Sequence, residues 1–75
     1  MKHHLKIHPE YFEAVKSKTK TFEIRKNDRD FKVGDKLSLR EFDTESGYTG
    51  RTLERKITYI TGYAQQGNYV VMAIK

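Results

Sequence analysis

A short polar run near residue 20 contains the residue types that could bind a ligand. Thr21, Glu23 and Arg25 alternate with Phe22 and Ile24, which is the period of a β-strand with one buried apolar face. On such a strand the three polar side chains point to one side, each about 6–7 Å from the next. A hydroxyl, a carboxylate and a guanidinium in a row can bind a small polar ligand through hydrogen bonds. The alternative is a solvated strand face, which is common in antiparallel sheets.

Lys20 precedes this run and adds a movable positive charge at the mouth of the predicted site. A desolvated Lys20 could form an acid/base pair with Glu23, whereas on a surface strand the two residues make an ordinary salt bridge. The chain contains no nucleophile elbow, no Ser-His-Asp pattern and no Gly-rich phosphate loop. We therefore expect binding in preference to catalysis, and no cofactor.

Two other segments carry residues suited to nucleic acid. Tyr48 and Arg51 lie on a predicted hairpin, where the ring could stack on a base and the guanidinium could hold a phosphate. Alternatively, Tyr48 packs back on the fold and Arg51 lies in solvent. Arg29, in a polar loop, could also reach a phosphate, or it is an ordinary solvated cation.

No metal site is expected. His3 and His4 are adjacent, so on a strand they face opposite ways and cannot share an ion. Asp28 and Asp30 flank a loop arginine, and loop aspartates more often make local turn hydrogen bonds than bind a cation.

Composition indicates one small, basic domain spanning residues 1–75. The 15 Lys and Arg residues outnumber the 10 Asp and Glu residues, giving a net charge of +5. This charge favours an anionic partner, RNA or a nucleotide first, although small domains also carry such charge for solubility alone. No apolar stretch approaches the roughly 20 residues that span a membrane, and no signal-peptide pattern follows Met1. We expect a cytoplasmic, cysteine-free protein, with a monomer favoured and no membrane partner.

Five strands and one helix would position these residues. The expected ranges are strands at 3–7, 20–26, after the turn at 33–35, 51–61 and 69–74, and a helix at 9–17. The last strand is apolar on both faces and should be the most buried. The predicted fold class is mainly β with one or two short helices (α+β), a small closed or nearly closed β-barrel of about five strands.

Side-chain periodicity indicates which residues face inward. Tyr11, Phe12 and Val15 form an apolar stripe on the helix, which would plug one end of the barrel. A bulge is expected to shift Phe42 on the third strand. Leu53, Ile57 and Tyr59 share a face of the fourth strand; Arg55 lies in the same row, so a bulge or the barrel rim must accommodate it.

The segments 18–25 and 31–35 together resemble the signature of ASCH domains of the PUA-like superfamily. That signature is Gly-x-Lys-x-x-Glu-x-Arg followed by a Val-Gly-Asp turn. Lys20, Glu23 and Arg25 match its Lys, Glu and Arg, and Lys18 stands in the place of its Gly. Nearly the whole chain is similar to small bacterial and phage ASCH/PUA proteins of unknown function. The resemblance implies a PUA-like β-barrel whose cleft, near the first helix, binds RNA or a nucleotide-like ligand.

Some members of that superfamily are amidohydrolases that remove the acetyl group from N4-acetylcytidine, using a Lys and a Thr on this strand and a later Glu. Lys20 matches their Lys, but Glu23 occupies the position of their Thr, and Thr21 is two residues out of register. The leading hypothesis is therefore a non-catalytic RNA- or nucleotide-binding module. The alternatives are a small hydrolase with Lys20 and Glu23 as the acid/base pair, and a protein-interaction domain with an acidic partner.

Overall fold

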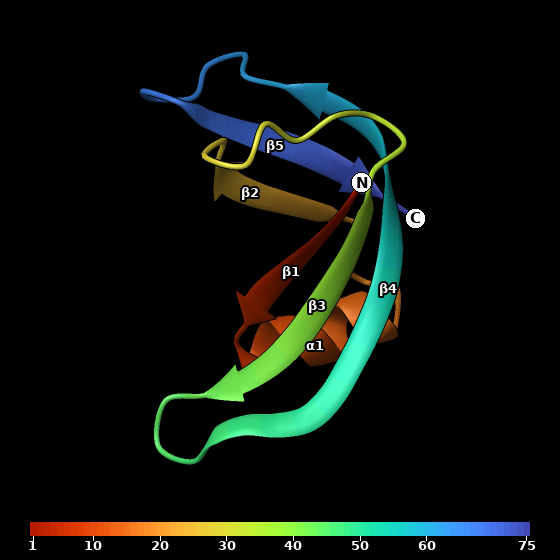
Figure 1. Ribbon diagram of the computed structural model, residues 1–75, viewed down its shortest axis with the longest axis vertical. Coiled ribbons are helices and arrows are strands. Elements are labelled where there is room, and N and C mark those ends of the chain that lie inside the picture. Colours follow the sequence, from red (N-terminus) through yellow and green to blue (C-terminus); the bar gives the residue numbers. More distant parts are fainter.

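The computed structural model describes all residues 1–75 and contains the five strands and the helix that the sequence predicts (Figure 1). The elements are β1 (Lys2–Ile7), α1 (Pro9–Lys16), β2 (Phe22–Lys26), β3 (Lys36–Asp43), β4 (Gly47–Thr61) and β5 (Tyr69–Ile74). Their order is confirmed, and their bounds lie close to the predicted ranges. The largest difference is β4, which starts at Gly47, so much of the predicted hairpin loop is strand.

The strands form one bent mixed sheet in the order β1-β3-β4-β5-β2. β1 runs parallel to β3, and every other neighbouring pair is antiparallel. The long strand β4 belongs to both halves, because it pairs with β3 up to Lys56 and with β5 from Ile57 onward. In Figure 1, β2 and β5 cross the upper part of the molecule, while β1 and β3 run below them. The fold is mainly β with one short helix, as predicted, but the sheet does not form the expected closed or nearly closed barrel, since the edge strands β1 and β2 do not pair.

Two arginine side chains, one from β2 and one from the loop that follows it, reach the unpaired edge of β1. Arg25 Nη2 donates a hydrogen bond to the carbonyl oxygen of Lys6, and Arg29 Nη1 donates to that of His4, at 2.8 Å. Backbone carbonyls on an unpaired edge otherwise depend on water or on another strand for a partner. The guanidinium groups therefore supply donors where a closed barrel would have a neighbouring strand.

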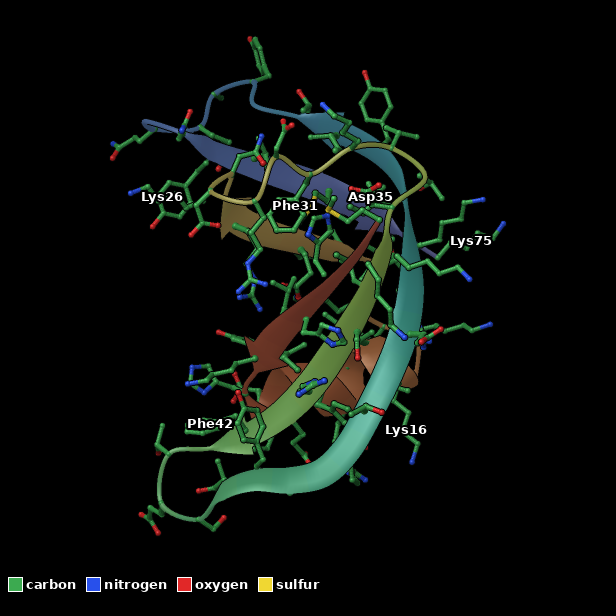
Figure 2. The ribbon with its side chains drawn as sticks, in the orientation of Figure 1. Lys16, Lys26, Phe31, Asp35, Phe42 and Lys75 are labelled. Carbon is green, nitrogen blue, oxygen red and sulfur yellow. The ribbon has the colours of Figure 1, made fainter.

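The core lies between α1 and the concave side of the sheet. It contains ten buried apolar side chains: Leu5, Ile7, Phe12, Val15, Phe31, Leu37, Leu39, Ile57, Met72 and Ile74. Every element except β2 contributes to it, and the loop between β2 and β3 adds Phe31, which points inward from that loop in Figure 2. An element without an apolar core residue has its inward face available for other contacts.

Burial differs from the predictions at three places. The most buried strand is β3, not β5, because β3 lies between β1 and β4 and also packs against α1. Tyr59 is 65% exposed, since a register shift between Ile57 and Tyr59 turns it away from the core. On α1, Phe12 and Val15 are buried, whereas Tyr11 is 44% exposed. The predicted bulge before Phe42 is confirmed by a register shift between Arg40 and Phe42.

The turn before β3 is tied to β1 by a buried histidine. Gly34 has φ of +96°, the left-handed conformation that glycine adopts at little cost, as expected for this turn. His3 Nε2 lies 2.8 Å from Asp35 Oδ2, and the Asp35 carboxylate also pairs with the N-terminal amine of Met1. These contacts, the His3 hydrogen bond first, lower the pKa of Asp35 to about 2.

The chain leaves α1 through a left-handed residue that is not glycine. Pro9 starts the helix, where its missing N–H leaves no bond unmade, and Glu10 and Lys16 have the charges that suit its two ends. Lys18, just beyond the end, has φ of +64°, and its N–H donates to the carbonyl of Val15. This is the position where the resembled signature has Gly. Lys18 thus adopts the glycine-like turn despite its side chain.

Candidate functional site

The inward face of β2 is polar and its outward face is apolar. Glu23 is 4% exposed, whereas Phe22 and Ile24 are 43% and 50% exposed. The expected buried apolar face of this strand is therefore wrong. β2 lies at the edge of the sheet, none of its residues belongs to the apolar core, and residues of both its faces line a hollow beside α1 and the end of β1.

The Glu23 carboxylate is held by two cations. Lys20 Nζ donates to Glu23 Oε1 at 2.6 Å and to the carbonyl of Phe22 at 2.8 Å. Arg25 Nε donates to Glu23 Oε2 at 2.9 Å, and its Nη2 reaches the carbonyl of Lys6. The structure therefore brings Lys20, Glu23 and Arg25 together, and their predicted role in ligand binding stays a prediction. Charge-assisted bonds to both oxygens fix the carboxylate in one orientation.

These three residues line an open hollow of about 550 Å³, which we call the Glu23 hollow. Its lining residues are Lys6, Ile7, His8, Tyr11, Lys20, Phe22, Glu23, Ile24 and Arg25. Its volume lies within the range of about 300–1,000 Å³ found for small-molecule sites. Lys20 Nζ lies 5.5 Å from the ring centroid of Tyr11 and 5.0 Å from that of Phe22, so both rings flank the charged group.

The charged groups retain capacity for further hydrogen bonds. A lysine ammonium has three donors, and Lys20 uses two of them, on Glu23 and Phe22. An arginine has five, and Arg25 uses two, on Glu23 and Lys6. Each oxygen of Glu23 accepts one bond and has room for about one more. The site can therefore donate to an anionic or carbonyl oxygen and accept from an N–H group at the same time.

Thr21 and Arg29 lie outside the Glu23 hollow. Thr21 precedes β2 and lines a second hollow on the other side of Lys20. Arg29 bonds to the His4 carbonyl and lines a third, smaller hollow of about 250 Å³ beneath the loop that contains Phe31. The sequence predicts that Thr21 and Arg29 bind the ligand together with Glu23 and Arg25, but in the structure neither of them lines the Glu23 hollow.

Arg51 takes part in a network that joins α1 to the β3–β4 hairpin. Its Nε donates to Glu41 Oε1 at 2.9 Å, its Nη2 pairs with Glu13, and its guanidinium lies 4.5 Å from the ring centroid of Phe12. Glu41 also accepts a hydrogen bond from the Thr49 hydroxyl at 2.6 Å. The pKa of Glu41 is lowered, chiefly by this hydroxyl and secondly by Arg51. The pKa of Arg51 is raised, chiefly by Glu13 and secondly by Glu41.

Tyr48 lies on the same hairpin, also outside the three hollows. Its ring packs edge-on against Phe42, with 5.0 Å between centroids, and Lys6 Nζ lies above both rings. Tyr48 is 55% exposed, and Phe42 stands at the base of the hairpin in Figure 2. The predicted nucleic-acid contacts of Tyr48 and Arg51 stay predictions, and the two residues do not join the Glu23 hollow.

Sequence reasoning missed Lys6, His8 and Tyr11 as lining residues. Tyr11 was expected in the core with its neighbour Phe12, but adjacent helical residues differ by about 100° around the axis, so one of them had to turn outward. His8 precedes the helix, and its ring meets that of Tyr11 edge-on at 5.9 Å. Lys6 contributes its backbone carbonyl, which accepts a hydrogen bond from Arg25, and the pattern of side chains in a sequence does not predict such a backbone contact.

The structure shows no cluster of three or more side chains of the metal-ligating types His, Cys, Asp and Glu. None of its helices has the length and apolar composition needed to cross a bilayer.

Comparison with known proteins assigns the chain to a family. The family model described as a domain of unknown function, DUF3850, matches residues 2–74. An Escherichia phage P2 protein, described as an uncharacterized 12.9 kDa protein in the GpA 3′ region, is 41% identical over 59 residues. The match covers 79% of this chain and 53% of the phage protein, so the chain spans about half the length of that relative. Neither match bears on the ASCH or PUA-like resemblance. The chain belongs to the DUF3850 family.

Proposed function

We propose that the Glu23 hollow binds single-stranded RNA or a nucleotide, and that the family is related to the PUA-like ASCH domains. The observation that carries the proposal is a carboxylate with 4% exposure at an open hollow, held between two cations. Lone buried carboxylates are costly, and this one is compensated at a place that a ligand can reach. A cluster with a purely structural role would have no need of the open volume beside it.

The chemistry of the hollow suits the edge of a nucleobase. A fixed carboxylate accepts hydrogen bonds from exocyclic amino and ring N–H groups, as Glu and Asp do with cytosine. The remaining donors of Lys20 and Arg25 suit a base carbonyl or a phosphate oxygen. The same hollow therefore offers both hydrogen-bonding polarities that a base edge presents.

Aromatic side chains beside the hollow supply stacking surfaces. Tyr11 and Phe22 are 44% and 43% exposed and come from α1 and β2. Single-stranded RNA is bound chiefly by stacking unpaired bases on such rings, together with contacts to the backbone. The net charge of +5 adds the long-range attraction that an anionic chain requires.

Chemical-shift titration with a degenerate pool of single-stranded RNA octamers tests the proposal. We expect saturable shifts in the amides of residues 20–25 and of Tyr11. Lys20→Ala and Arg25→Ala should each weaken binding by about tenfold and flatten its salt dependence. Lys56→Ala is the control, because Lys56 is exposed and lines none of the three hollows. Undetectable binding at low salt, or equal affinities for all three variants, would refute the proposal.

Hydrolysis of a modified nucleoside is the second candidate. The observation in its favour is the 2.6 Å contact between Lys20 Nζ and Glu23 Oε1, the separation that proton transfer within an acid/base pair requires. Incubation with N4-acetylcytidine followed by chromatography tests this reaction. Cytidine above the level given by Glu23→Gln would favour the enzyme, and equal levels would exclude this substrate.

A further inference from the structure

A second hollow lies on the other side of Lys20. It has a volume of about 430 Å³, and we call it the Lys18 hollow. It is lined by Val15, Lys18, Lys20, Thr21, Arg55, Thr58, Ala73, Ile74 and Lys75. Lys20 is the one residue that lines both this hollow and the Glu23 hollow, so the two hollows are neighbours.

The lining of the Lys18 hollow is strongly cationic. Four of its nine residues are Lys or Arg, and none is Asp or Glu. Lys20 is already paired with Glu23, but the other three positive side chains have no acidic partner, and an anion in the recess relieves the repulsion between them.

The cations differ in how far they are already engaged. Arg55 donates to the carbonyls of Val15, at 3.2 Å, and of its neighbour Glu54, which leaves three of its five donors. Lys18 and Lys75 are exposed, and neither takes part in any salt bridge of the structure. The hollow thus combines one anchored guanidinium with two lysines that have no acidic partner.

The backbone of Lys18 adds an independent observation. A non-glycine residue at φ of +64° is strained, and Gly would fill that position at lower cost. Because glycine would avoid this backbone strain, a lysine at this position suggests a functional role for its side chain. At Lys18 the side chain places a positive charge beside the hollow, which glycine could not do.

We infer that the Lys18 hollow binds a phosphate group of the same nucleotide chain whose base occupies the Glu23 hollow. This inference rests on the function proposed above and adds a second subsite to it. Lysines act on phosphate as point charges and Arg55 as a fork of N–H donors, and the Thr21 hydroxyl adds a neutral donor. The nucleotide backbone would pass over Lys20, which stands between the two subsites.

The test compares two double variants with the same loss of charge. Lys18→Gln with Lys75→Gln removes the two unpaired lysines, and Lys16→Gln with Lys56→Gln is the control. Lys16 and Lys56 are exposed and line neither hollow, and Figure 2 shows Lys16 at the end of α1, well apart from Lys75. Affinity for the RNA octamer pool is measured across a series of salt concentrations.

We expect the Lys18/Lys75 variant to bind RNA about tenfold more weakly at low salt than the control variant. The slope of log K against log salt should fall in magnitude by about 0.7, the value for one phosphate of a single strand that is no longer neutralised. Equal affinities and slopes for the two double variants, with wild-type RNA binding intact, would overturn the second subsite and leave the proposed function standing.

Two simpler ligands, nucleosides and inorganic phosphate, distinguish a failure of the second subsite from a failure of the proposed function. The four ordinary nucleosides lack phosphate, so they should shift residues 20–25 equally in the wild type and in the Lys18/Lys75 variant. Inorganic phosphate alone should shift the amides of Thr21 and Thr58 in the wild type at millimolar concentration, and not in that variant. Phosphate shifts with no binding of RNA or nucleosides would indicate a site for free phosphate and would overturn the shared ligand.

Discussion

Replacing Glu23 by glutamine tests the central ion-pair cluster most directly. Glu23→Gln keeps the size and one carbonyl acceptor but removes the charge that Lys20 and Arg25 share. The two cations would then face each other without a counter-ion, while their side chains are only 17% and 28% exposed. We therefore expect both lower stability and weaker ligand binding from this single change.

The magnitude follows from the burial of the three groups. Removing one partner of a fully buried ion pair costs about 3–5 kcal/mol. Both cations keep some contact with water, which screens their repulsion, so about 2 kcal/mol is the expected loss. With a urea m-value of about 1 kcal/mol/M for a domain of this size, the unfolding midpoint should fall by about 2 M.

Glu41→Gln is the matched control, because Glu41 is also a buried carboxylate bonded to a hydroxyl and an arginine, yet it lines none of the hollows. Urea unfolding followed by circular dichroism measures the midpoints, and RNA titration below the transition measures binding. Both variants should unfold at lower urea, and only Glu23→Gln should lose affinity. An unchanged midpoint for Glu23→Gln, or an equal loss of affinity in both variants, would refute this reasoning.

Three further outcomes are expected. The folded-state pKa of Asp35, about 2, lies below its ordinary 3.8, so its stabilisation is present above pH 4 and is lost as the pH falls toward 2. Urea midpoints measured from pH 5 to pH 2 should therefore fall more steeply for the wild type than for Asp35→Asn. Arg29→Lys removes the planar donor that reaches the His4 carbonyl, and should lower stability by about 1 kcal/mol in urea unfolding; no change would show that this bridge is unimportant. Lys18→Gly relieves the left-handed strain and should raise stability by about 0.5 kcal/mol, net of the greater freedom of glycine in the unfolded chain, while weakening RNA binding.

The sequence predicted the elements of this fold well, because each has a local signal. Pro9 marks the start of the helix, Gly34 permits the turn before β3, and alternating apolar residues mark the strands. The proximity of Glu23 and Arg25 follows from the same alternation, whereas Lys20 precedes β2 and reaches Glu23 through its long side chain.

The direction in which each face points was harder to predict, because it depends on distant parts of the chain. Alternation separates Glu23 from Phe22, but it does not say which of them faces inward. In the structure Glu23 is the buried residue, at the sheet edge, where Lys20 and Arg25 neutralise its carboxylate. Likewise, the register shift that turns Tyr59 outward depends on its pairing with β5, about 15 residues away.

Closure of the sheet could not be predicted from strand count. Five strands suffice for a small barrel, but β1 and β2 leave their facing edges unpaired. Nothing in the local sequence distinguishes an arginine that reaches a backbone carbonyl, as Arg25 and Arg29 do, from one that lies in solvent.

The arginine contacts at the open edge of this sheet connect the spacing of the edge strands to whatever occupies the Glu23 hollow. A ladder between two strands breaks cooperatively, whereas two guanidinium contacts break independently, at a cost of about 1 kcal/mol each. Arg25 takes part in both arrangements, because it bonds to β1 and also lines the Glu23 hollow. Any group that draws this guanidinium away from the Lys6 carbonyl leaves Arg29 as the remaining bridge between the two edges. Arg25 therefore connects the Glu23 hollow directly to the contact between the two edge strands.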